Sequence, residues 1–439
     1  MPLDRAATPS ETSTRSMCLT ERRWNALSRV STGTRSFPPW SRERSPQRRP
    51  MPTATFSIRS KRNPTRGRIP TSAMRSTSRD TFSTETLSIS TSCGACWNSQ
   101  MRVMREDPER AWRNPCAVQL DGTREYHVRR SSLDGTANAV MFLVTGNVEI
   151  LESAWLYVAV SKDVAWLERN LADLQGAASL IEDLTDRDGR LWSDVYYEDQ
   201  VIKDGRVAAA QGFAAAGLRY LADLETLAGA TEDAIRHRSL ADVLATSLVE
   251  PLPLGYWHSE RQRFVDWVDR HGVAHDHGSL LAHVVPVLMG AASDHQARSA
   301  LAFLDAEADA FQRFPSFVAA DIAGYGDDEI GVAGPYDLCA IARHWAWDAT
   351  LLARRGRRDD VHRQLLLVAR RAEEEGGYLS ERYDMDHVYY VDGNPAHGAT
   401  RYYEYPCTFT WLLFHAYLGV EPVLEGDVRL VVRRPHRGH

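Results

Sequence analysis

Long apolar runs are absent from this sequence. No uninterrupted apolar stretch reaches the roughly 18 residues that a membrane-spanning helix needs. The most apolar segment, AVMFLVTGNVEILESAWLYVAV, is broken by Asn147, Glu149 and Glu152, and the first residues lack the apolar core of a signal peptide. We therefore expect no membrane partner.

Cysteine is scarce, with six residues in a chain of 439. Cys93 and Cys96 form one CxxC pair without a second pair, so they predict no zinc site. The sequence has no HExxH motif and no HxxxH pair on a predicted helix, and it lacks a Gly-rich phosphate loop, a serine nucleophile elbow and a dinucleotide fingerprint. We predict no metal, no cofactor and a reducing, cytoplasmic setting.

Positive charge is in deficit after residue 100. Residues 1–100 contain 17 Lys and Arg against 6 Asp and Glu, which leaves 35 against 52 in the rest of the chain. Nucleic-acid binding depends on basic residues that neutralise phosphates, so the acidic body argues against a nucleic-acid partner. The oligomeric state stays open.

Residues 1–104 are rich in Ser, Thr, Arg and Pro and show neither strand nor helix periodicity. Such a composition cannot bury enough apolar surface to offset the entropy of ordering, so we predict a disordered leader. Our preferred explanation is a wrongly assigned start site or reading frame. A basic arm for an acidic partner is the other interpretation.

The body, residues 105–425, alternates apolar helical stretches with tight and long connections, and residues 426–439 read as a short basic tail. Apolar periodicity predicts helices at 138–160, 164–184, 206–229, 232–248, 279–292, 295–312, 336–355, 358–374 and 403–418. A repeated pair of helices whose long connections fall at one end is typical of an αα-toroid. We predict an all-α (α/α)6 toroid, incomplete at four and a half hairpins, with an open α-solenoid as the alternative.

The long connections, residues 186–204, 249–278, 313–335 and 375–402, place Trp and Tyr beside carboxylates. Exposed aromatic rings cost hydration unless a ligand covers them, and a sugar does so while carboxylates bind its hydroxyls. Glycoside cleavage needs two carboxyl groups that flank the bond. The candidates are Glu198, Asp199, Asp204, Asp276, Glu329 and Glu404. Any single one could instead cap a helix or bind an arginine. Burial of Glu404 against an arginine would argue against the catalytic roles of Glu198, Asp199 and Glu404.

Four stretches together resemble the six-hairpin glycosidase superfamily, within it the α-L-rhamnosidase-like and glycogen-debranching-like catalytic domains. They are FLVTGNVEILESAWLYVAVSKDVAWLERN, DGRLWSDVYYEDQVIKDGR, FVDWVDRHGVAHDHGSLLAHVVPVLMG and RYYEYPCTFTWLLFHAYLGVEP. The resemblance covers roughly residues 105–422 and is one of layout more than of a diagnostic signature. Where the family's loop has Asp-Glu-Arg and Gly-Asp, this chain has Glu-Asp-Gln and Lys-Asp-Gly.

The resemblance implies an inverting glycoside hydrolase that acts on an oligosaccharide or glycoside. It assigns the general acid to Glu198 or Asp199 and the base to Glu404. The expected substrate-binding residues are Trp192, Asp194, Tyr197, Lys203, Asp204, Trp257, Asp276, His277, Tyr325, Glu329 and Tyr403. Open alternatives are a sugar phosphorylase, an epimerase or lyase if histidines and not carboxylates converge, and a catalytically inactive sugar-binding barrel.

Overall fold

The structure is a computed structural model of the 439-residue chain. It describes residues 98–115, 117–118, 124–125, 144–193, 201, 203, 205–330, 338–383, 389–391, 394–396 and 401–431. Most of the expected leader and most of the acidic segment 194–204 lie outside these residues.

Helices form where the apolar periodicity predicts them. They are α4 (Thr145–Ser161), α5 (Val164–Leu184), α6 (Ala208–Leu227), α7 (Thr231–Val249), α8 (Leu280–Leu288), α9 (Asp294–Ala306), α10 (Ala308–Gln312), α11 (Ala342–Arg354), α12 (Arg358–Glu374) and α13 (Glu404–Leu412). The predicted bounds of α5 and α12 match, whereas the predicted helix 295–312 is divided into α9 and α10. A π-helical turn, η3 (Leu413–Tyr417), continues α13.

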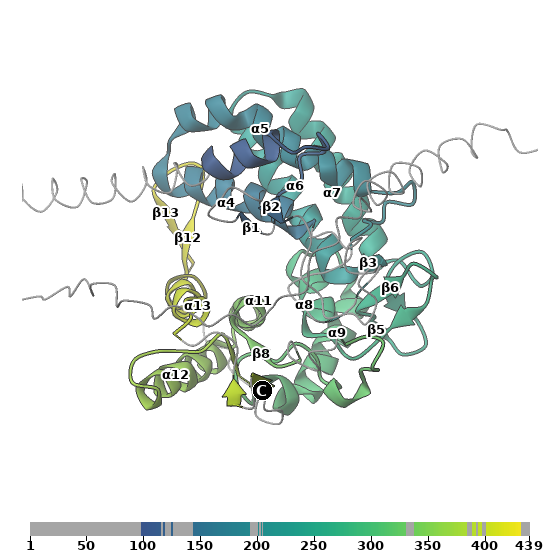
Figure 1. Ribbon diagram of the computed structural model, residues 1–439, viewed down its shortest axis with the longest axis vertical. Coiled ribbons are helices and arrows are strands. Elements are labelled where there is room, and N and C mark those ends of the chain that lie inside the picture. Colours follow the sequence, from purple (N-terminus) through teal and green to yellow (C-terminus); the bar gives the residue numbers. More distant parts are fainter. Residues whose placement is uncertain are drawn as a thin grey trace, which may run out of the picture.

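Among the described residues, five helices pack on one another in sequence order: α4 on α6, α6 on α8, α8 on α11 and α11 on α13. We call these five the inner helices, and α5, α7, α9 and α12 the outer helices. The outer helices α5, α7, α9 and α12 each pack on the inner helix that precedes them. Figure 1 shows this succession along a curved path, with α4 and α13 at its two ends. The hairpin of β12 (Val420–Pro422) and β13 (Val428–Leu430) connects the ends, because β12 contacts both η3 and α4. Among the described residues, no helix is long and apolar enough to cross a membrane.

The long connections contain short strands, so the expectation of an all-α fold is corrected to a mainly helical one. One three-stranded sheet joins β3 (Gly205–Val207), β6 (Trp267–Asp269) and β7 (Ala274–His275). Two-stranded pairs join β4 (Trp257–His258) to β5 (Arg263–Phe264), β8 (Ala340–Ile341) to β9 (Arg382–Tyr383), β1 (Ala117–Val118) to β2 (Arg124–Glu125), and β10 (Tyr389–Val391) to β11 (Asn394–Ala396).

These pairings bring the four long connections together. The end of the first connection pairs with the second through β3 and β6, and with the third through the bridge of Val201 to Ile330. The second also contacts the third where Ser279 bridges to Ala319, and the third joins the fourth through β8 and β9. Each of the four long connections, or the residues directly after it, therefore contacts at least one other among the described residues.

Regular structure also occurs on either side of the expected domain of residues 105–425. Residues 98–105 are helical, and Met101 and Met104 are buried in the main core cluster with Leu151 and Leu174, so order begins before residue 105. Val428–Leu430, which we assigned to the basic tail, forms β13. The first segment is held by tertiary packing of Met101 and Met104, whereas β13 is held by its hairpin pairing with β12.

Candidate active site

A cavity of about 650 Å³ lies between the inner helices α4, α6, α11 and α13. We call it the central cavity. Its lining includes Glu149, Glu152 and Trp155 from α4, Phe213 and Tyr220 from α6, Arg343, Trp347 and Arg354 from α11, and Trp411 from α13. The volume is within the usual range for a small-molecule site, and the lining mixes aromatic rings with a few charged groups.

Two carboxyl groups of α4 reach this cavity. Glu149 and Glu152 are three residues apart and therefore share one helix face. Burial raises the pKa of Glu149 to about 7, with help from the charge of Glu152 and against the opposing charge of Arg343. Burial also raises the pKa of Glu152. At neutral pH a large fraction of Glu149 keeps its proton, which is the state that a general acid requires.

Glu404 lies in the first turn of α13, where its Oε1 is 2.8 Å from an Nη of Arg343 on α11. Burial raises the pKa of Glu404, and the Arg343 charge opposes this rise. The Oε2 atom is buried and accepts no hydrogen bond from the described residues. The charge of Glu404 also raises the pKa of Glu149, so the two carboxyl groups interact.

The arginine contact is the arrangement that we associated with a structural role for Glu404. It is not a fully compensated ion pair, however, because burial leaves the carboxyl with a raised pKa. Arg343 therefore holds the carboxyl group of Glu404 in position, while burial favours the protonated form of that group. A positioned, titratable carboxyl group beside a cavity is also what acid–base chemistry needs.

Aromatic side chains cover much of the rest of the cavity. The rings of Trp155 and Tyr220 have centroids 5.3 Å apart, and those of Phe213 and Trp347 are 4.4 Å apart. Trp411 is exposed and contacts the ring of His415. These rings give the cavity apolar faces of the kind that cover one side of a sugar ring.

Several expected site residues meet at the long connections. We call this group the loop cluster; it comprises Lys203, Trp267, His275, His277, Tyr325 and Glu329. The ring of His277 stacks on Tyr325 at 3.8 Å, and that of His275 stacks on Trp267 at 4.3 Å. Both histidines contact the carboxylate of Glu329. The buried ammonium of Lys203 is 2.9 Å from Asp266 and lies over the Trp267 ring.

Burial opposes ionisation of Glu329, but hydrogen bonds from the two histidines hold the pKa of this carboxyl well below its usual value. Among the expected residues, Lys203, His277, Tyr325 and Glu329 are therefore brought together. His275, which was not in the expected set, belongs to the same group.

Other expected site residues have different surroundings. Trp257 is 5% exposed and packs against Phe264 in the core, so its ring is not available to a sugar. Asp276 accepts hydrogen bonds from Arg261 and Arg263. It does not cap α8, because Ser279 does so. These surroundings do not support the expected sugar-binding roles of the two residues, which were based on sequence position without knowledge of burial.

Trp192 and Tyr403 are the remaining expected sugar-binding residues that the structure describes. The guanidinium of Arg206 lies 4.7 Å from the centroid of Trp192. Tyr403 is 65% exposed and packs on Tyr402, so it remains accessible to a ligand. Asp194, Tyr197, Glu198, Asp199 and Asp204 lie outside the described residues.

Sequence reasoning missed Glu149, Glu152 and Arg343. A signal was present, because two glutamates interrupt an otherwise apolar helix. Asn147, the other interruption, has a structural role: its amide donates hydrogen bonds to the carbonyls of Trp112 and Ala177. Only the packing of α4 shows that the two glutamates face a cavity and that the Asn147 amide binds backbone carbonyls in the core.

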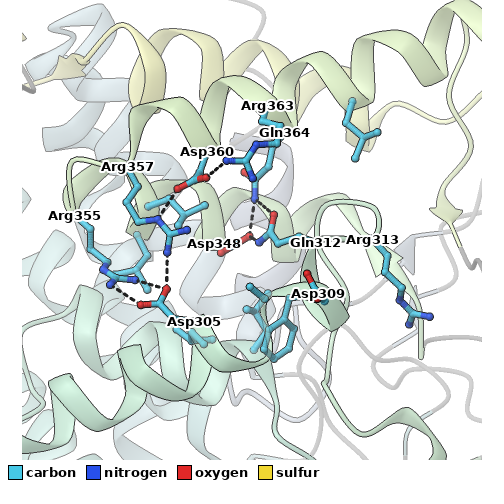
Figure 2. Close-up of a pocket in the computed structure, with 17 residues that line it drawn as sticks. Asp305, Asp309, Gln312, Arg313, Asp348, Arg355, Arg357, Asp360, Arg363 and Gln364 are labelled. Carbon is cyan, nitrogen blue, oxygen red and sulfur yellow. Dashed lines mark hydrogen bonds and ion pairs between the residues drawn. The ribbon is translucent and has the colours of Figure 1, made fainter. Parts of the chain in front are cut away.

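A second cavity, of about 520 Å³, lies between α9, α10, α11 and α12 (Figure 2). Its charged groups are largely paired with one another. Asp305 binds Arg355 and Arg357, and Asp360 binds Arg357 and Arg363. Because these charged side chains bind one another, fewer of them are available to a ligand than in the central cavity.

No protein-family model and no curated protein matches the chain. Similar solved structures include a GH78 family rhamnosidase of Bacillus sp. GL1, at 17% identity over 65% of this chain and 27% of that chain, with a TM-score of 0.45. A rhamnosidase from Klebsiella oxytoca with rhamnose bound is 18% identical over 62% and 47%, with a TM-score of 0.43. A sialidase is 17% identical over 64% and 26%, with a TM-score of 0.47. This chain thus spans about a quarter to a half of these proteins, and such distant likenesses transfer no activity to it.

Proposed function

We propose that this protein is a carbohydrate-active enzyme that hydrolyses a glycosidic bond at the central cavity. The observation that carries the proposal is the interaction of two carboxyl groups with raised pKa values, Glu149, which lines a cavity with aromatic faces, and Glu404, which binds Arg343 of the same lining. Glycoside hydrolysis uses two carboxyl groups with a tuned pKa, and aromatic rings bind sugars.

The residues divide the reaction as follows. A protonated carboxyl donates its proton to the glycosidic oxygen as the bond from that oxygen to the anomeric carbon breaks. An ionised carboxylate accepts a proton from a water molecule whose oxygen bonds to the anomeric carbon. Glu404 is the proposed base, since Arg343 favours its ionised form.

Two separate lines of argument give candidates for the general acid. The sequence resemblance assigns it to Glu198 or Asp199, and the structure adds Glu149, whose pKa of about 7 suits proton donation at neutral pH. We keep inversion of configuration as part of the proposal. The sugar-binding candidates that remain are Trp192, Asp194, Tyr197, Lys203, Asp204, His277, Tyr325, Glu329 and Tyr403.

We also propose that residues 105–425 form one αα-toroid domain. Support comes from the sequential packing of the inner helices and from the strand pairs that join the long connections. In this arrangement the connections surround one opening, through which an oligosaccharide or glycoside would enter.

Aryl glycosides with poor and activated leaving groups test these roles. Removing the general acid, by Glu149→Gln, Glu198→Gln or Asp199→Asn, should slow cleavage of a phenyl glycoside by about 10²–10⁴-fold and spare a dinitrophenyl glycoside, which needs no proton. Glu404→Gln should slow both. Glu168→Gln, an exposed change on α5, is the control.

Proton NMR of the first sugar released gives the stereochemistry, and inversion is expected. Full activity of Glu404→Gln would remove the proposed base. Cleavage of none of a broad panel of glycosides by the unaltered protein would argue for the inactive sugar-binding barrel.

A phosphorylase is the second candidate, because Arg343 and Arg354 both line the central cavity and could bind phosphate. In that reaction phosphate replaces water and the product is a sugar phosphate. Assays with and without inorganic phosphate separate the two. The epimerase alternative required histidines without carboxylates, whereas the described histidines of the loop cluster both contact Glu329.

A further inference from the structure

The sequence HDH at residues 275–277 places two imidazoles on one side of the chain. His275 ends β7, and side chains two residues apart in extended backbone point to the same face. The third long connection brings Glu329 to that face from 52 residues farther along the chain. Three groups that commonly bind metals thus meet at a point where two connections contact each other.

The distances between the three side chains fit a metal ion that all three would bind. His275 Nδ1 is 2.5 Å and His277 Nε2 is 3.1 Å from Glu329 Oε1. One ligand atom from each of the three residues lies within 4.8 Å of the others. Ligands at about 2.0–2.2 Å from a zinc ion lie roughly 3–3.5 Å from one another, so small adjustments would accommodate an ion.

Surrounding residues hold the three groups in these orientations. The indole of Trp267 lies flat against His275, with an interplanar angle of 5°, and Tyr325 stacks on His277. The second nitrogen of His275 is 3.5 Å from the Asp269 carboxylate, an outer partner of the kind that orients metal-binding histidines.

Glu329 and Asp269 are themselves held by the backbone. The amide of Gly326 donates to Oε2 of Glu329 at 2.9 Å. Oε1 contacts both histidines, and Oε2 also lies 3.0 Å from Nε2 of His277. Backbone amides of His271 and Val273 donate to Asp269, each at 2.8 Å. Backbone hydrogen bonds therefore hold the carboxylates of both Glu329 and Asp269 in position.

We propose that His275, His277 and Glu329 bind a divalent transition metal ion of the zinc class. Two imidazole nitrogens and one carboxylate oxygen are a ligand set that zinc uses when one position stays open for water or another ligand. Calcium and magnesium prefer oxygen ligands, so the nitrogen donors disfavour them. The ion would cross-link the second and third long connections.

The test uses the full chain after dialysis against a chelator, titrated with Zn²⁺ in a calorimeter. One equivalent should bind. His277→Ala and Glu329→Gln should weaken binding by more than about 100-fold, the upper range for changes to outer partners. His271→Ala removes an exposed imidazole from the same connection and should keep the affinity. Zinc should raise the melting temperature of the unaltered protein and of His271→Ala, but not of the two ligand variants.

A second measurement does not depend on variants that might misfold. Zinc-edge X-ray absorption of the unaltered protein should show two imidazole nitrogens per ion, and Co²⁺ in its place should give a visible spectrum. Failure of the unaltered protein to bind Zn²⁺, Co²⁺ or Mn²⁺ would overturn the proposal and leave a hydrogen-bonded His–Glu–His group. Unchanged binding in the ligand variants would overturn it as well, because the ion would then lie elsewhere.

Discussion

Glu404 and Arg343 form an ion pair at 2.8 Å that joins the start of α13 to the start of α11. The charge of the same arginine opposes the rise that burial causes in the pKa of Glu149. One guanidinium therefore favours the ionised form of two carboxyl groups from different helices.

Replacing Arg343 should move the pH dependence of catalysis. Arg343→Gln removes a charge that lowers the pKa of both Glu149 and Glu404, so both pKa values should rise. The acidic limb, which reports ionisation of the base, and the alkaline limb, which reports protonation of the acid, should both shift to higher pH by about 1 unit. Profiles of kcat/KM measure the shift, with Arg238→Gln on α7 as the control. If the acid is Glu198 or Asp199, only the acidic limb need move.

Glu149 should make the protein less stable as the pH rises. Its pKa is about 7 in the folded state against 4.5 in the unfolded chain, so the folded state binds more protons between these values. The free energy of unfolding should therefore fall as the pH rises from 4.5 through 7. Glu149→Gln removes this dependence, and urea unfolding at pH 5 and pH 8 measures it. An equal pH dependence in this variant and in Glu168→Gln would contradict the assignment.

His283 should make the protein less stable as the pH falls, which is the opposite of the effect of Glu149. Burial lowers its pKa to about 4 from 6.5, against the hydrogen bond that its Nδ1 donates to the carbonyl of Ser279 at 2.7 Å. The unfolded chain binds the proton first, so stability should fall as the pH drops from 6.5 toward 4, by at most about 3 kcal/mol. His283→Gln should flatten this part of the curve in urea unfolding. The exposed His295→Gln should not, and a flattening there would point to a different titrating group.

Asp348 should be important for stability near the second cavity. Its Oδ2 accepts hydrogen bonds from Ser316, Gln312 and Gln364, at 2.7, 2.7 and 2.9 Å, as Figure 2 shows in part. Asp348→Ala leaves these buried donors without their acceptor and should cost about 2–4 kcal/mol of unfolding free energy.

Asp348→Asn keeps a carbonyl oxygen and should cost less than Asp348→Ala. Asp309→Ala changes an exposed carboxylate on the same cavity and should stay within about 0.5 kcal/mol of the unaltered protein. Chemical unfolding of the three variants checks the order. A loss in Asp348→Ala no larger than in Asp309→Ala would mean that the donors find other partners.

Much of the helical framework was predictable, because a helix is set by a pattern repeated every few residues. The observed bounds of α5 and α12 equal the predicted ones. The gathering of Lys203, His277, Tyr325 and Glu329 followed from the expected gathering of the long connections. The burial of Trp257 and the pairing of Asp276 could not be predicted, because the sequence neighbours of a loop residue do not reveal whether its side chain is exposed, buried or paired.

Local sequence patterns are enough to predict where helices form, the alternation of tight and long connections, and the acidic character of the body. Which charged groups meet depends on the packing of the folded chain. Glu149 and Glu404 are carried by the first and last inner helices, and His275 and Glu329 come from different connections. Periodicity acts within a few residues, whereas these contacts depend on how distant segments pack. Their pKa values follow from that packing, because burial and neighbouring charge exist only once the chain has folded.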